Sequence, residues 1–173
     1  MSAVILHPYV PGHREADQGP TWRVLGELRQ RWEVEDMALG ADPYGYWAEL
    51  FARWHDGRTW LVIEHDIEPS IGLVEEMLEC PETMCTRPYA TGPGQHEAVA
   101  QFEAGRVPWS VAASLGCTKI APAARAHPWP LPQPVHWSRL DTELTSRMTR
   151  LPGEMWHLHW GRLVHHHDYE EAQ

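Results

Sequence analysis

With 173 residues, 43% of them hydrophobic and 22% charged, the chain has the composition of a soluble globular protein. We expect one domain over residues 1–173 in the cytoplasm, because no stretch reaches the roughly 18 apolar residues of a membrane span and no signal peptide opens the sequence. The formal net charge of -10 disfavours broad binding to nucleic-acid phosphates. A single lysine and no asparagine are typical of a GC-rich genome, such as that of an actinobacterium or its phage.

The chain begins with a short apolar run. Residues 4–6 predict a buried strand, and His7 and Pro8 are expected to end it. The polar residues 8–20 then predict a loop at the carboxyl end of this strand.

A helix and a second strand are expected next. Thr21 can cap a helix over about 22–31, in which apolar residues recur on one stripe. Residues 32–34 predict a short strand, and Glu35 and Asp36 begin an acidic loop after it.

The same alternation continues through the next three segments. Residues 44–55 have the spacing of an amphipathic helix, and residues 59–63 form a continuous β-branched and aromatic run, typical of a strand buried on both faces. A further helix is expected over residues 69–79. Alternating strands and helices predict an α/β fold with a parallel sheet.

The second half of the chain has weaker patterns. Strands are expected at residues 83–89 and 114–120. A helix is expected at 137–149, where apolar residues again share one stripe. Two short strands are expected within the histidine-rich segment 156–167.

Cysteines and histidines are candidate ligands for softer metals. Cys80, Cys85 and Cys117 are odd in number and are spaced neither as a zinc knuckle nor as a redox pair, so we expect reduced thiols. Segment 156–167 contains a cluster of histidines, and neutral imidazole is a good ligand for Mn, Fe or Zn. Most of these histidines are equally well explained as structural or exposed side chains.

The most informative motif follows the strand at 59–63. Glu64 and Asp66 come directly after it, and their side chains lie on the same side if the extended backbone continues. Ligands of open α/β sheets bind at the carboxyl ends of the strands. Neighbouring acids repel each other unless a cation or hydrogen-bond donors compensate, and hard divalent cations prefer oxygen ligands. A solvated acidic turn is the alternative interpretation.

This strand and its acids resemble the DxD or ExD metal-binding motif of nucleotide-sugar glycosyltransferases with the GT-A fold. The resemblance extends over about residues 4–167 and implies a single GT-A-like, Rossmann-like domain of three α/β/α layers with a mostly parallel central sheet. It also implies a Mn²⁺ or Mg²⁺ cofactor that holds the diphosphate of a nucleotide-sugar donor. The acceptor stays open among a protein, a modified DNA base, a lipid and a small molecule.

In several members of this family, a histidine near the C-terminus completes the coordination that the acidic motif begins. The resemblance therefore implies metal ligation by Asp66 together with His165 or His167. Here Glu64 replaces the first Asp of the motif, and relatives with that change use the residue to contact the donor ribose or a metal-bound water.

The resemblance also implies a general base. In inverting members, a carboxylate at the start of a late helix removes the proton from the acceptor hydroxyl, a role that accelerates the step by roughly 10²–10⁴. Asp141 resembles this residue by its order in the chain, with Glu143 as the substitute. Alternatively, Asp141 is a first-turn acid that the helix dipole favours.

The donor would lie against the first two strands. In GT-A folds the segment after the first strand cradles the nucleotide base, so Tyr9 would stack on the base and Arg14 would approach a phosphate. An acid after the second strand, Glu35 or Asp36, would hydrogen-bond the base or ribose. The residues expected to bind the nucleotide sugar are His7, Pro8, Tyr9, Arg14, Asp36, Tyr46, Glu64 and His65.

The sequence thus predicts a metal-dependent, inverting glycosyltransferase. One alternative is a metal-dependent phosphoester hydrolase built on the histidines and acids, although the chain has no HExxH motif. A second alternative is a non-catalytic module that binds a nucleotide or a metal.

Overall fold

The computed structural model of the chain describes residues 2–12, 19–89, 115–148, 150 and 156–166. Arg14 and His167, and parts of several expected elements, lie outside these residues. No helix in the described part of the chain is both long enough and apolar enough to cross a membrane. The elements are β1 (Ala3–Tyr9), α2 (Pro20–Leu28), β2 (Glu33–Ala38), α3 (Gly45–Arg53), β3 (Thr59–Ile63), β4 (Ile67–Pro69), α4 (Ile71–Glu79), β5 (Met84–Thr86), β6 (Cys117–Ile120), the 3₁₀ helix η2 (Ala124–Ala126), α6 (Trp137–Met148), β7 (Trp156–Leu158) and β8 (Leu163–His165).

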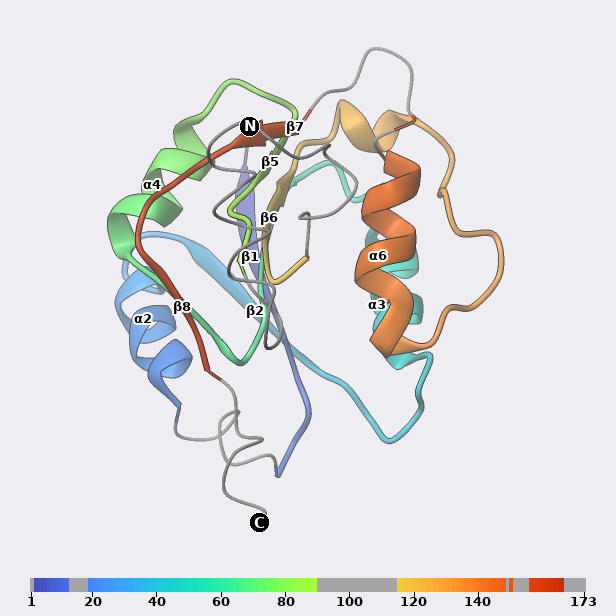
Figure 1. The fold of residues 1–173 in the computed structure, drawn as a ribbon, viewed down its shortest axis with the longest axis horizontal. Helices are drawn as coiled ribbons and strands as arrows, with labels where there is room; N and C mark the ends of the chain where they lie inside the picture. Colours follow the sequence, from blue (N-terminus) through green and yellow to red (C-terminus); the bar gives the residue numbers. More distant parts are fainter. Residues whose placement is uncertain (1, 13–18, 90–114, 149, 151–155, 167–173) are drawn as a thin grey trace.

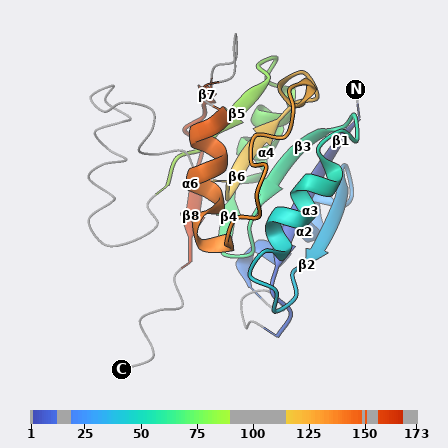
Figure 2. The ribbon, with the colours of Figure 1, turned by 90° about the vertical axis from the view of Figure 1, so that its right-hand side faces the viewer.

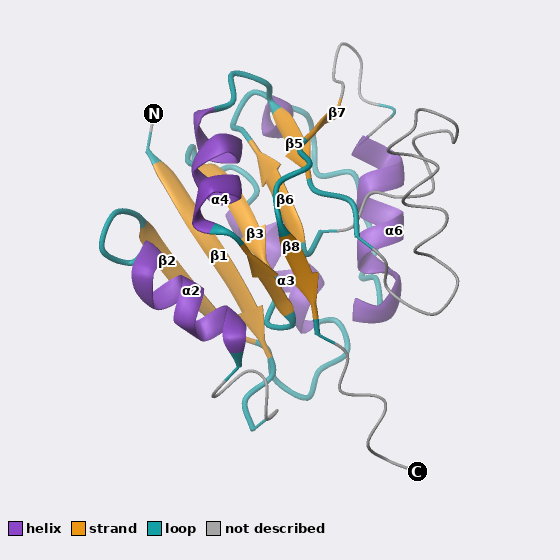
Figure 3. Cartoon of the chain, turned by 60° about the vertical axis from the view of Figure 1, so that its left-hand side comes forward, coloured by secondary structure: helices purple, strands orange, loops and turns teal. Residues whose placement is uncertain are grey.

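Six of the strands form one mixed sheet in the order β2-β1-β3-β6-β5-β7 (Figure 3). β1 pairs in parallel with both β2 and β3, and β5 pairs in parallel with β7. β6 is antiparallel to both of its neighbours, β3 and β5. The expected α/β fold with a mostly parallel sheet is therefore confirmed, with β6 as the antiparallel exception.

Helices cover both faces of this sheet, so that the molecule has three layers. α2 and α4 lie on one face, and α3 and α6 lie on the other (Figures 1 and 2). Successive side chains of a strand point to opposite faces. Accordingly, Val4 and Leu6 of β1 join the core under α3 and α6, whereas Ile5 joins the core under α2 and α4. β3 divides in the same way, which confirms that it is buried on both faces.

The first strand is longer than the sequence indicates. β1 continues through His7 and Pro8 to Tyr9, so the prediction that His7 and Pro8 end it is wrong. Proline lacks the N–H that a central strand needs. Pairing between β1 and β3 ends at Leu6, however, and β2 alone pairs with β1 beyond that point. Pro8 therefore lies where β1 has become an edge.

β2 also extends further than expected. It runs from Glu33 to Ala38, so Glu35 and Asp36 lie within the strand rather than in a loop after it. Both acids are engaged by arginines, Glu35 by Arg58 and Asp36 by Arg29. These ion pairs make two acidic residues compatible with an edge strand.

The extended backbone expected at the acidic motif is replaced by a turn. The N–H of Ile67 donates to the carbonyl of Glu64 at 3.0 Å, which closes a four-residue turn. The short strand β4 follows and pairs with β8 in a separate two-stranded sheet. Pro69, expected to open a helix, ends β4 instead, and α4 begins after Ser70, whose hydroxyl accepts from the N–H of Leu73.

Candidate active site

The candidate site lies at the carboxyl ends of β1, β2 and β3. The chain passes from β1 to β2 on one side and returns to β3 on the other side, so the strand order reverses at β1. In open α/β sheets such a switch point is where ligands bind. At this point the imidazole of His7 donates from Nδ1 to the carbonyl of Ile63 at 2.9 Å, which joins the ends of β1 and β3.

Glu64 is the first residue after β3, and its carboxyl faces the layer of α3 and α6. The hydroxyl of Tyr46, in α3, donates to Glu64 Oε1 at 3.0 Å. Burial raises the pKa of Glu64 well above its ordinary value, and the charges of Asp141 and Asp66 raise it further, whereas the Tyr46 hydrogen bond acts in the opposite direction. Glu64 is thus a half-buried acid beside two other acids.

Asp66 is placed by the turn and by the pairing of β4 with β8. Ile67 lies opposite His165 in this pair, and His165 donates from Nε2 to Asp66 Oδ2 at 3.0 Å. Burial alone would raise the pKa of Asp66, but the hydrogen bond with His165 and the nearby imidazoles of His65 and His165 outweigh it and lower that pKa. The structure therefore brings together Asp66 and His165, one of the two histidines expected to share a metal with it.

The late helix contributes Asp141 to the same cluster. Its charge raises the pKa of both Glu64 and Tyr46, after the effect of burial on each. Glu143, the substitute candidate, is instead held by Arg139 at 2.6 Å one helical turn away. Of the two candidate bases, Asp141 is the one that the structure places beside the acidic motif. We call Tyr46, Glu64, Asp66, Asp141 and His165 the acid cluster.

A second group of predicted residues lies on the opposite face of the sheet, against α2. The rings of His7 and Tyr9 are stacked with centroids 5.7 Å apart, and Trp22 of α2 packs edge-on against both. Burial lowers the pKa of His7, and the hydrogen bond to Ile63 offsets this only in part. We call His7, Tyr9 and Trp22 the aromatic cluster.

Asp36 lies in the strand register beside His7, on β2. Its two carboxylate oxygens accept from Nη2 of Arg29 at 2.5 and 2.6 Å. Arg29 also lies over the ring of Trp22, 5.1 Å from its centroid. Asp36 is therefore near the aromatic cluster and paired with a cation. Of the remaining predicted contacts, His65 lies within the turn between the two clusters and Pro8 is buried in β1.

Hard oxygen donors in the acid cluster suit the expected Mn²⁺ or Mg²⁺. The negative charges of Asp66 and Asp141 raise the pKa of the half-buried Glu64, and a divalent cation would compensate such a group of acids. Among the described residues, however, the acid cluster does not gather three ligand atoms within 4.8 Å of one another. Mg²⁺ is usually bound by only one or two protein carboxylates, with substrate phosphates and water as its other ligands.

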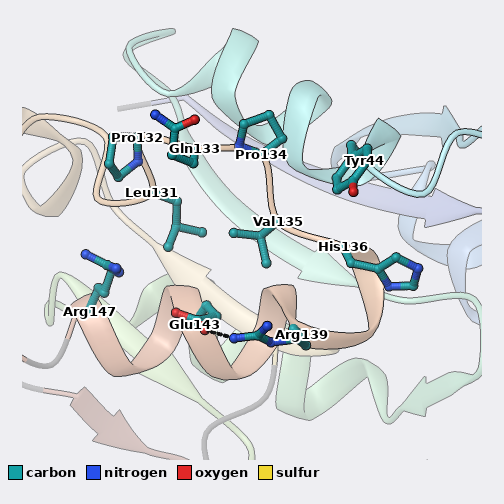
Figure 4. A pocket seen from close by; sticks show the side chains of 10 residues that line it. All are labelled: Tyr44, Leu131, Pro132, Gln133, Pro134, Val135, His136, Arg139, Glu143 and Arg147. Atoms are coloured by element: carbon teal, nitrogen blue, oxygen red, sulfur yellow. Dashed lines mark hydrogen bonds and ion pairs between the residues drawn. The ribbon is translucent and has the colours of Figure 1, made fainter.

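A separate pocket of about 300 Å³ lies between α6, the segment 131–136 and Tyr44 (Figure 4). Arg139, Glu143 and Arg147 project into it from α6. The acids Glu64, Asp66 and Asp141 do not line this pocket. Arg139, Glu143 and Arg147 make it a polar pocket that contains no residue of the acid cluster.

Two aromatic residues of the site were not predicted as functional from the sequence. Tyr89 packs on His165 with ring centroids 4.9 Å apart, and Trp22 completes the aromatic cluster. From the sequence, Trp22 is predicted only as an apolar residue on one face of a helix. The role of Tyr89 depends on Gly116, since a Cβ at Gly116 would lie 1.9 Å from the Tyr89 hydroxyl. Neither contact leaves a local sequence pattern.

No protein-family model matches this chain, and no curated protein sequence matches it. Among solved structures, the chain is similar to the crystal structure of a glycosyltransferase involved in the glycosylation of the major capsid of PBCV-1, with a TM-score of 0.50 and 14% sequence identity. The likeness covers 92% of this chain and 82% of that one. The chain therefore shares the mixed α/β fold of a glycosyltransferase structure.

Proposed function

We propose that this chain is a metal-dependent glycosyltransferase that moves a sugar from a nucleotide-sugar donor to an acceptor hydroxyl with inversion. The observation that carries the proposal is the acid cluster, in which Glu64, Asp66, Asp141 and His165 converge at the switch point of the sheet from three separate segments. The likeness of the fold to a glycosyltransferase structure supports it.

Asp66 and His165 would hold Mn²⁺ or Mg²⁺, with His167 as the second candidate histidine. Bound there, the cation would neutralise the charge of the departing diphosphate. Glu64 has a distinct role in this proposal, because burial and its neighbours favour its neutral form in the absence of a cation. The Tyr46 hydroxyl would hold the Glu64 carboxyl in place, and that carboxyl would then orient the donor or a metal-bound water.

Asp141 would accept the proton of the acceptor hydroxyl. In an inverting reaction, the acceptor oxygen displaces the nucleoside diphosphate in one step, so a carboxylate on the acceptor side suffices as general base. Asp141 belongs to α6, which lies on the opposite face of the sheet from α2 and Trp22 (Figure 1). This arrangement separates the proposed acceptor side from the proposed donor side.

The aromatic cluster would receive the nucleotide. Tyr9 and Trp22 offer ring faces for stacking on a base, and His7 is buried beside them at the end of β1. Asp36 would hydrogen-bond the base or the ribose, held in place by Arg29. Arg14 would approach a phosphate, as the sequence predicts.

Thermal unfolding with a panel of sugar nucleotides, each with and without Mn²⁺, tests the donor site. A ligand that binds the native state stabilises it by about 2.7 kcal/mol at a hundredfold excess over Kd. We expect one sugar nucleotide to raise the melting temperature only when Mn²⁺ is present, and we expect Asp66→Asn to abolish this rise.

Glu68→Gln is the matched control for Asp66→Asn. Glu68 pairs with His166 at 2.9 Å, as Asp66 pairs with His165 at 3.0 Å, in the same pair of chain segments. The control should keep the donor-dependent rise. If Mn²⁺ alone raises the melting temperature but no sugar nucleotide raises it further, the proposed donor site is wrong.

A further inference from the structure

A second group of metal-ligating side chains lies at the other end of α4 from the acid cluster. Cys80 follows the last residue of α4, Cys85 lies in β5, and His159 follows β7. One ligand atom from each of the three lies within 4.8 Å of the other two. In the described part of the chain, this is the place where three such atoms come together.

The ring of His159 is held in one orientation. Its Nδ1 lies 2.7 Å from Glu76 Oε1, on the last turns of α4, and its backbone N–H donates to the carbonyl of Thr86 at 3.0 Å. The side chain is 3% exposed, and its Nε2 has no hydrogen-bond partner among the residues that the structure describes. A buried ring nitrogen without a partner is costly unless a ligand uses it.

A histidine that binds zinc through one ring nitrogen usually donates the N–H of its other ring nitrogen to a carboxylate or a carbonyl. The carboxylate fixes the tautomer and leaves Nε2 as the ligand. Glu76 stands in that position for His159. The hydrogen bond to Glu76 places the ring proton on Nδ1 and leaves a lone pair on the unpartnered Nε2. Both observations indicate a cation next to Nε2.

The donor set defines the kind of cation. Two thiol sulfurs and an imidazole nitrogen are soft or borderline ligands, which select zinc over magnesium or manganese. The three cysteines together lack the spacing of a zinc knuckle, but the four residues between Cys80 and Cys85 are within the range that other zinc sites use for a cysteine pair. Lys119, the lone lysine of the chain, donates from Nζ to the carbonyl of Cys80, so a positive charge lies next to the thiolates that zinc would require.

We propose that Cys80, Cys85 and His159 form a zinc site, with both thiolate sulfurs and His159 Nε2 as ligands and water in the fourth position. Binding releases the two thiol protons to solvent. The site joins the end of α4 to β5 and to the segment after β7, and β7 is an outer strand of only three residues (Figure 1). Zinc would therefore fasten the outer edge of the sheet.

The first experiment uses the wild-type chain, reduced, stripped of metal and then loaded with Zn²⁺ or Co²⁺. We expect one zinc per chain after removal of free metal. We also expect bound Co²⁺ to show thiolate-to-cobalt charge-transfer absorption, which oxygen and nitrogen ligands alone do not give. Cobalt bound without that absorption would place the metal elsewhere and overturn the proposal, as would the absence of bound zinc.

Substitutions assign the ligands. Cys85→Ser and His159→Gln should lose the bound zinc and the cobalt absorption, whereas Cys117→Ser should keep both. Cys117 is a matched control because it is a buried thiol outside the cluster, in contact with the Met77 sulfur at 3.7 Å. Loss of zinc from Cys117→Ser with retention in Cys85→Ser would contradict the assignment.

Glu76→Gln provides a test that does not remove a ligand. Its side chain is 57% exposed, so the variant should fold normally. Losing the carboxylate behind a metal-bound histidine typically weakens metal affinity by about 10–100-fold. We expect that loss in zinc competition titrations, and an unchanged affinity would overturn the proposed role of His159.

Discussion

At the scale of single residues, the protonation of Glu64 affects the stability of the metal-free protein. Burial and the charges of Asp141 and Asp66 raise its pKa in the folded state above the ordinary value of 4.5. The folded state therefore keeps this proton to higher pH than the unfolded state does. The resulting stability is fully present below pH 4.5 and is lost as the pH rises through the raised pKa.

Asp66 acts in the opposite direction in a separate pH range. The hydrogen bond with His165 is among the effects that lower its pKa below the ordinary value of 3.8, despite burial. Its contribution to stability is present above that value and is lost as the pH falls through the lowered pKa. The two acids therefore affect the pH profile on opposite sides of about pH 4.

Glu64→Gln should remove the loss of stability above pH 4.5. A single group contributes a slope of at most about 1.4 kcal/mol per pH unit. We expect urea unfolding in EDTA to show this slope in the wild type and a flatter profile in the variant, which keeps an acceptor for the Tyr46 hydroxyl. Glu143→Gln, which alters an ion pair on the surface of α6, serves as control. Equal slopes in the wild type and Glu64→Gln would contradict the account.

At the scale of elements, Gly116, the residue just before β6, leaves room for the side chain of Tyr89. A Cβ at Gly116 would lie 1.9 Å from the Tyr89 hydroxyl oxygen and 3.0 Å from Ile67 Cγ1. Tyr89 in turn packs on His165, the partner of Asp66. The absence of a side chain at one residue therefore allows a contact that supports the acid cluster.

Gly116→Ala should destabilise the fold by about 1–3 kcal/mol, the usual effect of overpacking. Gly26→Ala is the matched control, because Gly26 lies inside α2 and a Cβ there would meet no atom of the described residues within 4 Å. This replacement inside a helix should stabilise the fold by about 0.5–1 kcal/mol. Chemical denaturation measures both. A Gly116→Ala variant as stable as the wild type would show that Tyr89 can move without loss.

Arg125 is the second residue that ties elements together. It is buried in η2, lies over the ring of Trp60 at 3.7 Å, and donates to the Trp54 carbonyl at 2.8 Å and to Asp56 Oδ1 at 3.1 Å. These partners belong to the end of α3 and the start of β3. A buried cation is tolerated here because carbonyls and a carboxylate surround it.

Arg125→Met should cost about 3–5 kcal/mol, because it leaves buried acceptors without a donor. Arg139→Met removes an arginine from an exposed pair with Glu143, in which the Arg139 side chain is 72% exposed, and should cost less than about 1 kcal/mol. The two midpoints in urea test this difference. Equal losses would mean that Arg125 contributes no more than a surface arginine.

At the scale of the whole molecule, the sequence predicts most of the elements but not their ends. The run at 59–63 is predicted as a strand and is β3 with the same bounds, because burial on both faces leaves a continuous apolar signal. Pro8 misleads because a proline usually ends a central strand, and only the register with β3 shows that the pairing has already ended. The turn after Glu64 places Asp66 against His165 of β8, which lies 99 residues further along the chain.

The candidate site divides in the same way. The order of the acidic motif and the late histidines, read through the resemblance, predicts a metal held by Asp66 with His165 or His167. The structure places His165 Nε2 3.0 Å from Asp66 Oδ2, and metal ligation by them stays a prediction. The cluster of Cys80, Cys85 and His159 was not predicted, because the histidine reaches the cysteine pair only through the parallel pairing of β5 with β7. Contacts that depend on tertiary pairing leave no local pattern in the sequence.

The most direct test of the central claim is the release of nucleoside diphosphate from sugar nucleotides by the wild type, Asp141→Asn and Glu143→Gln, with and without Mn²⁺. We expect release from one donor, dependent on the cation and stimulated by an acceptor, with a rate about 10²–10⁴ lower in Asp141→Asn and nearly unchanged in Glu143→Gln. Donor-dependent stabilisation should persist in Asp141→Asn. Cleavage of simple phosphoesters with no release from any sugar nucleotide would contradict glycosyl transfer and identify a hydrolase.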